Sequence, residues 1–192
     1  MTTGNPEALH FLQTRRSRPA KTLRAPAPDR AALMPLLQAA ARSPDHGKLE
    51  PWRFIVLQGS ALRRLGALAQ TRGEALDMDA DQIAKARSQF DLAHLAVAVV
   101  SSPKPSDKIP GSEQILSAGA VCLALLNAAL AAGWGANWLS GWASHDRAFV
   151  REGLGLGDHE TIAGFIHIGT ESSAPPERPR PDLAAITTWM DI

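Results

Sequence analysis

Apolar residues recur every three or four positions in several parts of the chain, which is the pattern of amphipathic helices. In the first of these, residues 6–14, the spacing predicts that Leu9, Leu12 and Phe11 face inward. A second helix is predicted from Asp29, a suitable N-cap, to about Arg42. Further helices, the first of them capped by Ser60, are predicted over residues 60–71, 80–89 and 146–153.

Short apolar runs between these helices predict strands. The strongest are LAVAVVS at 95–101 and TIAGFIHIG at 161–169, and weaker ones lie at 53–58 and 136–139. Helices outnumber strands, so the pattern predicts one mixed domain of helices and strands over residues 1–192.

The most apolar segment, residues 115–132, is about as long as a membrane span. A helix that is apolar on every side can cross a membrane or lie at the centre of a globular domain. Ser117 and Asn127 interrupt the run, and no cluster of Lys or Arg flanks it. We therefore predict a buried central helix over residues 112–132, ended by Gly133.

The chain from Glu171 onward is rich in proline, and we predict no regular structure around its four prolines. Trp189, near the end of this tail, is large and apolar. Such a tail is expected to lie across a surface, either its own or that of a partner.

Composition narrows the classes of function. Lys plus Arg number 20 and Asp plus Glu number 19, a balance that argues against nucleic acid as the main partner. The single cysteine, Cys122, lies in an apolar run and is expected to be a small core residue. The first residues, MTTGNPEALHF, lack the basic start and apolar run of a signal peptide, so we expect a cytoplasmic protein.

Three segments carry candidate chemistry. Arg15-Arg16-Ser17 offers forked donors for a phosphate, although a basic pair at a helix end also favours the helix dipole. RSPDHGKLEPW at 42–52 places polar donors just before a strand, where they can grip a ring or form a capped turn. GWGANWLSGW at 133–142 combines glycines, which allow close backbone approach, with tryptophans that can wall a planar ring or form a small aromatic core.

Other candidate motifs lack the residue spacing that their function requires. GLGLG at 153–157 is not a dinucleotide-binding loop, and no predicted strand leads into it. The histidines lack metal-ligand spacing, so no metal site is predicted. His167, which alternates within a predicted strand, is expected to be a hydrogen-bonded structural residue.

Taken in order, these segments resemble the nitroreductase family of FMN flavoproteins, in particular its small, single-domain bacterial members described as NAD(P)H nitroreductases. The markers are RRS at 15–17, RSPDHGKLEPW at 42–52, GSE before the apolar helix at 111–113, GWGANWLSG at 133–141 and GFIHIGT at 164–170. The resemblance implies an α+β fold, with a central, mostly antiparallel sheet surrounded by helices. It also implies an intertwined homodimer with FMN at the interface, in which residues 171–192 embrace the partner.

The resemblance also implies roles for residues. Those expected at FMN are Arg15, Arg16, Ser17, Trp138, Leu139 and Ser140, together with Arg42 and His46 at an FMN shared with the other subunit. The nicotinamide-nucleotide region corresponds to Ala128, Ala129, Leu130, Ala131, Ala132 and Gly133. A basic pair near the C-terminus of many members helps to bind phosphate, and Arg178 and Arg180 have that spacing.

One departure from the family pattern concerns the turn before Pro51-Trp52. Larger relatives have Asn and Gln there, bonded to the flavin ring, where this chain has Lys48 and Glu50. We hypothesise that these charges shift the flavin potential.

The activity that the resemblance implies is the transfer of electrons from NADH or NADPH to a nitroaromatic, a quinone or another small acceptor. Such ping-pong hydride transfer needs no catalytic side chain, because the flavin carries the chemistry. Two alternatives stay open. One is other flavin chemistry, such as dehalogenation or flavin fragmentation, and the other is a flavin-binding module without turnover.

Overall fold

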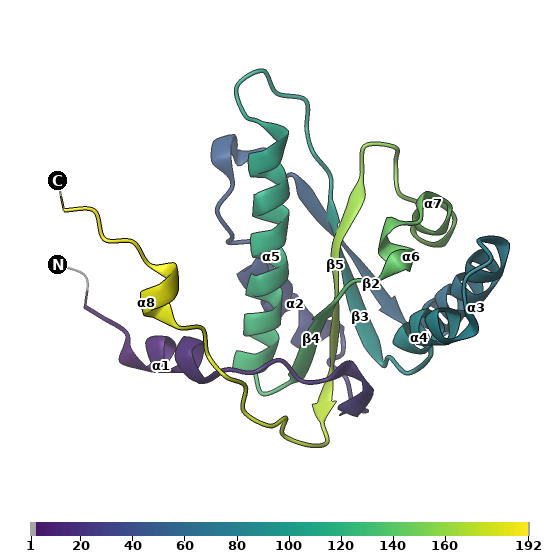
Figure 1. The fold of residues 1–192 in the computed structure, drawn as a ribbon, viewed down its shortest axis with the longest axis horizontal. Helices are drawn as coiled ribbons and strands as arrows, with labels where there is room; N and C mark the ends of the chain where they lie inside the picture. Colours follow the sequence, from purple (N-terminus) through teal and green to yellow (C-terminus); the bar gives the residue numbers. More distant parts are fainter. Residues whose placement is uncertain (1–2, 192) are drawn as a thin grey trace.

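The computed structural model describes residues 3–191 and shows an antiparallel sheet with helices on both faces (Figure 1). The strands are β1 (Leu23–Arg24), β2 (Trp52–Gln58), β3 (Leu95–Ser101), β4 (Gly135–Leu139) and β5 (Thr161–Glu171). Their order is β1-β5-β3-β2, with β4 also paired to β5, and every pairing is antiparallel. The α+β class and the antiparallel sheet are therefore confirmed.

The longer helices form two layers. One layer holds α2 (Arg30–Ala40) and α5 (Gly111–Ala131), which bury Val97, Val99 and Ile166 of the sheet. The other holds α3 (Ser60–Ala75), α4 (Ala80–Asp91), α6 (Trp142–His145) and α7 (Arg147–Leu154), as Figure 1 shows. Strand β3 is buried along its whole length because it lies between β5 and β2 and is covered on both faces.

Helix α5 begins and ends close to the predicted bounds, and Gly133 with φ 85° follows its end. It is long and apolar enough to cross a membrane by length and composition alone. One side packs on the sheet and on α2, where burial raises the pKa of Cys122 to about 12. The opposite side exposes Ile115, Leu116 and Leu123, so only part of the predicted burial occurs within this chain.

Two local predictions are wrong. Leu9 and Leu12 are each 57% exposed, because α1 (Pro6–Thr14) projects away from the sheet (Figure 1). The N-cap of α3 is Gly59 rather than Ser60, since the turn out of β2 is made at Gly59 with φ 52°. Around the four prolines the tail has no regular structure, as predicted, and beyond them it forms one helical turn that was not predicted, α8 (Leu183–Ile186), capped by Asp182.

The segment after α1 is mostly extended, but it also contains a 3-10 turn, η1 (Ala20–Thr22), and the short strand β1. A second 3-10 turn, η2 (His46–Lys48), lies in the polar loop after α2. In Figure 1 the extended segment passes the C-terminal end of α5, beside the tail. This arrangement brings the two ends of the chain to the same pole of the molecule.

Candidate functional site

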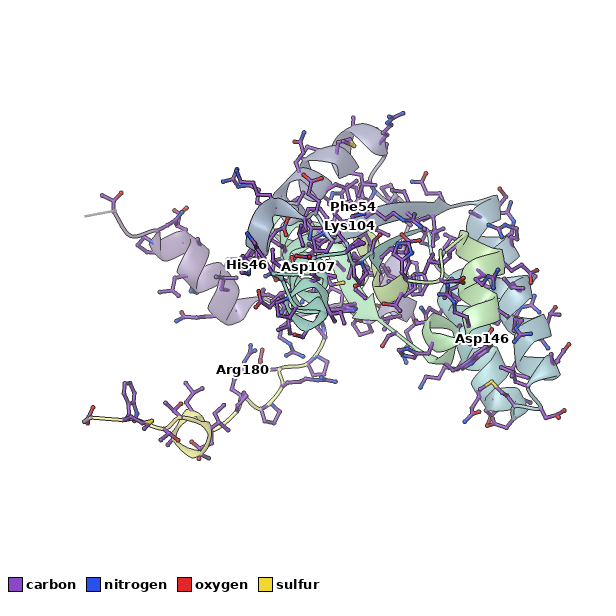
Figure 2. The ribbon with its side chains drawn as sticks, turned by 90° about the horizontal axis from the view of Figure 1, so that it is seen from above. His46, Phe54, Lys104, Asp107, Asp146 and Arg180 are labelled. Atoms are coloured by element: carbon purple, nitrogen blue, oxygen red, sulfur yellow. The ribbon has the colours of Figure 1, made fainter. Side chains whose placement is uncertain are left out.

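Four arginines converge on one pocket at this pole. Arg15 and Arg16 come from the segment after α1, and Arg178 and Arg180 come from the tail, which runs outside the helices and the sheet (Figure 2). The pocket has a volume of about 680 Å³. Its other lining residues are Ser17, Pro19, Asn137, Trp138, Pro175 and Pro176. Two groups of predicted site residues that are more than 150 positions apart in the sequence therefore meet here.

The arginine pocket concentrates positive charge. Burial lowers the pKa of Arg15, and the neighbouring charges of Arg180, Arg16 and Arg18 lower it further. The Arg15 Nη2 donates to Ser17 Oγ at 3.0 Å, but its buried Nε finds no hydrogen-bond partner among residues 3–191. A bound anion would relieve both the repulsion and the unmet hydrogen bond.

Backbone contacts hold the arginine segment beside strand β4. The Arg18 N–H donates to the Ala136 carbonyl at 2.8 Å, and the Asn137 Nδ2 donates to the Arg18 carbonyl at 2.7 Å. The Trp138 indole lies over Gly164 of β5, where any larger side chain would overlap the ring. The pocket therefore forms where the segment after α1 runs along the edge of the sheet.

A second pocket of about 330 Å³ lies between η1, the C-terminal half of α4 and strand β4. It shares the lining residues Pro19 and Asn137 with the arginine pocket, so the two pockets are neighbours. The predicted residues Leu139 and Ser140 line it, and so do Lys21, Lys85, Ser88, Gln89 and Leu92. We call it the ring pocket, because its lining combines apolar residues such as Leu92 and Leu139 with several polar ones, as binding sites for small ligands do.

His167 lies at the ring pocket and is only 2% exposed. Its Nε2 is buried and has no hydrogen-bond partner in the described part of the chain, so the prediction of a hydrogen-bonded structural histidine is wrong for this atom. The residue opposite it in the sheet, Asn137, donates its amide to Arg18 instead. Burial lowers the pKa of His167 to about 4, so the ring is neutral at pH 7.

The predicted nicotinamide region meets the same arginines from another side. Leu130 and Gly133 line a pocket of about 460 Å³ together with Arg15 and Arg16. Ala129, in contrast, is fully buried, so its side chain is not available to a ligand.

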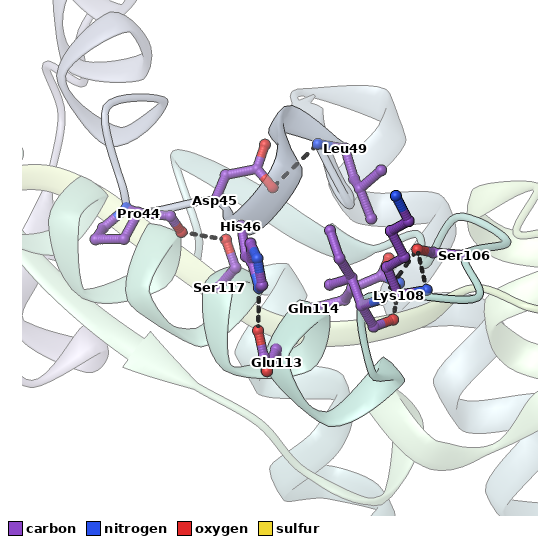
Figure 3. Close-up of polar contacts among 10 residues, drawn as sticks. Pro44, Asp45, His46, Leu49, Ser106, Lys108, Glu113, Gln114 and Ser117 are labelled. Atoms are coloured by element: carbon purple, nitrogen blue, oxygen red, sulfur yellow. Dashed lines mark hydrogen bonds and ion pairs between the residues drawn. The ribbon is translucent and has the colours of Figure 1, made fainter.

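Arg42 and His46 lie elsewhere in this chain. The Nδ1 of His46 is 2.7 Å from Glu113 Oε2 at the start of α5 (Figure 3). Leu130 at the other end of α5 borders the arginines, and the helix separates Glu113 from Leu130 by about 26 Å. Arg42 and His46 therefore do not line the arginine or ring pocket of their own chain.

The turn that carries Lys48 and Glu50 lies beside His46. Both residues are exposed, with φ of 54° and 47°. The Asp45 carboxylate holds the turn by accepting the backbone N–H groups of Leu49 and Glu50 at 3.2 and 2.8 Å. The two departures from the family pattern thus lie with Arg42 and His46, away from the ring pocket of the same chain.

The sequence did not single out the residues that α4 and η1 contribute to the ring pocket. Lys85, Ser88 and Gln89 recur at helical spacing on one side of α4, which was the only available signal. Polar residues in that pattern usually mark a solvated face. Only the packing of α4 near β4 distinguishes a ligand-facing side from a solvent-facing one.

Comparison with known proteins agrees with this geometry. The nitroreductase family matches residues 12–170. The chain belongs to the nitroreductase family. Family members are oxidoreductases, and the chain is therefore an enzyme of that class.

Curated relatives in this family include two bacterial proteins. The chain is 37% identical over 164 residues to "Putative NAD(P)H nitroreductase YdjA" of Escherichia coli (strain K12), covering 85% of this chain and 88% of that protein. It is 36% identical over 165 residues to "Putative NAD(P)H nitroreductase" of Haemophilus influenzae, with the same coverage.

Solved structures of nitroreductases share the fold. A nitroreductase-like family protein from Bacillus cereus superposes with a TM-score of 0.80 at 24% identity, covering 99% of this chain and 98% of that one. An FMN-dependent nitroreductase from Clostridium difficile R20291 gives a TM-score of 0.68 at 19% identity, with 94% and 98% covered.

Proposed function

We propose that this nitroreductase-family protein binds FMN and passes electrons from NADH or NADPH to a small acceptor such as a nitroaromatic or a quinone. The observation that carries the proposal is the pair of neighbouring pockets. One pocket is lined by four arginines and the other is walled for a planar ring, and they meet at Pro19 and Asn137. A ligand with a phosphate at one end and a flat ring at the other matches this shape and charge.

The residues present fit FMN. Arg15, Arg16 and Ser17 would hold its phosphate, and the unmatched Nε of Arg15 supplies a donor for it. Pro19 and Asn137 would border its chain, while Leu139, Ser140 and Gln89 would contact its ring. When bound, FMN supplies hydride transfer between the nicotinamide and the acceptor.

Charged side chains of the protein would influence that chemistry. Lys21 and Lys85 place positive charge beside the ring pocket, which favours an anionic ligand there. His167 is neutral and buried, so it adds no further charge at the ring pocket. No side chain is required to move a proton or to form a covalent bond, and we assign no catalytic residue.

We further propose a homodimer that completes two such sites. The exposed apolar residues Ile115 and Leu116 on α5, and Leu9 on α1, offer a surface for a second copy. The tail carries Trp189, which is 84% exposed and free to pack on that copy. Arg42 and His46 of one subunit would then reach the FMN of the other. We place the enzyme in the cytoplasm, without nucleic acid or membrane as a partner.

The visible absorbance spectrum of the purified protein, before and after anaerobic addition of NADH or NADPH, tests the proposal. We expect flavin bands that bleach. Flavin bands that persist would favour a flavin-binding module without turnover. Absence of flavin, even after FMN is added, would overturn the assignment of the two pockets.

A second assay identifies the acceptor. Steady-state oxidation of NADH or NADPH with a nitroaromatic or a quinone should proceed with ping-pong kinetics. Turnover of halogenated aromatics alone, or consumption of the flavin itself, would instead support the other flavin chemistries.

A further inference from the structure

The tail brings a carboxylate as well as arginines to the phosphate end of the site. Glu177 lies between Pro176 and Arg178, both of which line the arginine pocket. Its side chain is 67% exposed, and it reaches Arg16, whose side chain is only 14% exposed. A carboxylate of the chain itself therefore lies at the mouth of the pocket in which a ligand anion is expected.

Both oxygens of Glu177 lie within ion-pair distance of an arginine nitrogen. Oε2 is 3.2 Å from Arg16 Nη1, and Oε1 is 3.0 Å from Arg180 Nη2. Oε1 also accepts the backbone N–H of Arg178 at 3.1 Å. These contacts bridge the segment after α1 and the tail, which is the set of partners that a phosphate in this pocket would use.

We propose that Glu177 occupies part of the anion site when no ligand is bound, and that a ligand phosphate has to displace it. This inference rests on the proposed function and adds a residue that weakens binding of phosphate without affecting binding of the ring. It makes Glu177 a determinant of how strongly the site prefers FMN over riboflavin, which is the same molecule without the phosphate.

The geometry favours competition between Glu177 and the ligand phosphate over joint binding of the two. A phosphate that pairs with Arg16 and Arg180 approaches the same guanidinium groups that Glu177 already contacts, and the two anions repel each other. Because Glu177 is exposed and lies on a segment without regular structure, its side chain can swing into water at little cost. Riboflavin carries no anion and would leave the contacts of Glu177 in place.

The test measures dissociation constants for FMN and for riboflavin by quenching of flavin fluorescence, using full-length protein freed of bound flavin. We expect Glu177→Gln to bind FMN about three-fold more tightly than the unmodified protein does, with riboflavin unchanged. Unchanged or weaker FMN binding would overturn the inference, and so would an equal gain for riboflavin.

Glu171→Gln is the matched control. Glu171 pairs with Arg18 at 2.7 Å, outside the arginine pocket, so this variant loses a nearby charge and one ion pair. It should change FMN affinity less than Glu177→Gln does. An equal gain in both variants would mean that net charge alone is responsible, and the inference would fail.

Inorganic phosphate separates this inference from the proposed function. If the unmodified protein binds neither flavin, the proposed function fails, but the competition can still be measured. Inorganic phosphate should then raise the melting temperature of Glu177→Gln more than that of the unmodified protein. Equal shifts in the two proteins would overturn the inference by itself.

Discussion

Arginines occupy two regions of this molecule that differ in how their charge is balanced. On the side of α3 and α7, Arg72 donates to both oxygens of Asp146 at 2.9 and 3.0 Å, and Figure 2 shows Asp146 among these helices. Arg53 donates likewise to both oxygens of Glu160 at 2.7 and 2.8 Å. At the opposite pole, Arg15 and its neighbours crowd one another around an open pocket.

The carboxylates of the first region also accept hydrogen bonds from the backbone. Asp146 caps α7 through the N–H of Phe149 at 2.7 Å, and Glu160 accepts the N–H of Gly157 at 2.9 Å. Each such arginine is matched by an acid that the fold itself fixes. Where arginines instead outnumber the acids that the fold holds near them, the excess positive charge indicates a site for an anionic ligand.

Removing a guanidinium from the arginine pocket should have the largest effect. We expect Arg15→Gln to weaken FMN binding by about 100-fold, because a charge-assisted hydrogen bond to phosphate is lost, and to leave riboflavin binding nearly unchanged. Fluorescence titration measures both constants. Equal losses for the two flavins would show that Arg15 supports the fold rather than the phosphate.

Breaking a matched pair should instead lower stability. Glu160→Gln is expected to reduce the free energy of unfolding by about 2 kcal/mol at pH 7, since Arg53 loses the buried carboxylate with which it pairs. Urea denaturation provides the measurement. Asp158→Asn, at an 86% exposed acid in the same loop, should change it by less than about 0.5 kcal/mol.

The loss of stability in Glu160→Gln should depend on pH. Arg53 lowers the pKa of Glu160 from 4.5 to about 2 in the folded protein. The carboxylate therefore stabilises the fold above pH 4.5, and this contribution is lost as the pH falls towards 2. The difference between the unmodified protein and Glu160→Gln should shrink over that interval, and a constant difference would contradict the assignment.

His167 differs from both groups of arginines, because its buried Nε2 has no hydrogen-bond partner in the described part of the chain. Its effect on stability should be smaller. Its folded pKa is about 4, below the ordinary 6.5, so protonation favours unfolding and stability falls between pH 6.5 and 4. We expect His167→Leu to gain about 1 kcal/mol at pH 7 and to lose this dependence. Urea denaturation as a function of pH would test it, and a loss of stability at pH 7 would contradict it.

The smallest effects concern charges near the flavin ring. We expect Lys85→Gln to lower the flavin midpoint potential by about 20 mV, because a cation beside the ring pocket is removed. Glu50→Gln should raise it by about 10 mV if the turn of one subunit reaches the ring of the other. Spectroelectrochemical titration measures both potentials, and no shift in Glu50→Gln would argue against a role for Glu50.

Much of the fold was predictable because local patterns agree with the final packing. The apolar runs at 95–101 and 161–169 became β3 and β5, and Asp29 caps α2 as expected. The predictions failed where burial depends on distant segments. Leu9 and Leu12 have the spacing of a buried face, yet each is 57% exposed in the described chain.

By itself, the sequence determined the longer helices, the four main strands and the RRS segment, since periodicity and charge are local properties of a chain. That Arg178 and Arg180 lie beside Arg15 was implied only by the family resemblance, and nothing in the sequence indicated that Lys85 and Gln89 face the same ligand site as Ser140. Those neighbours come from separate elements, and only the path of the segment after α1 along β4 joins them. The site is thus a product of tertiary packing, because its charges act through space rather than along the chain.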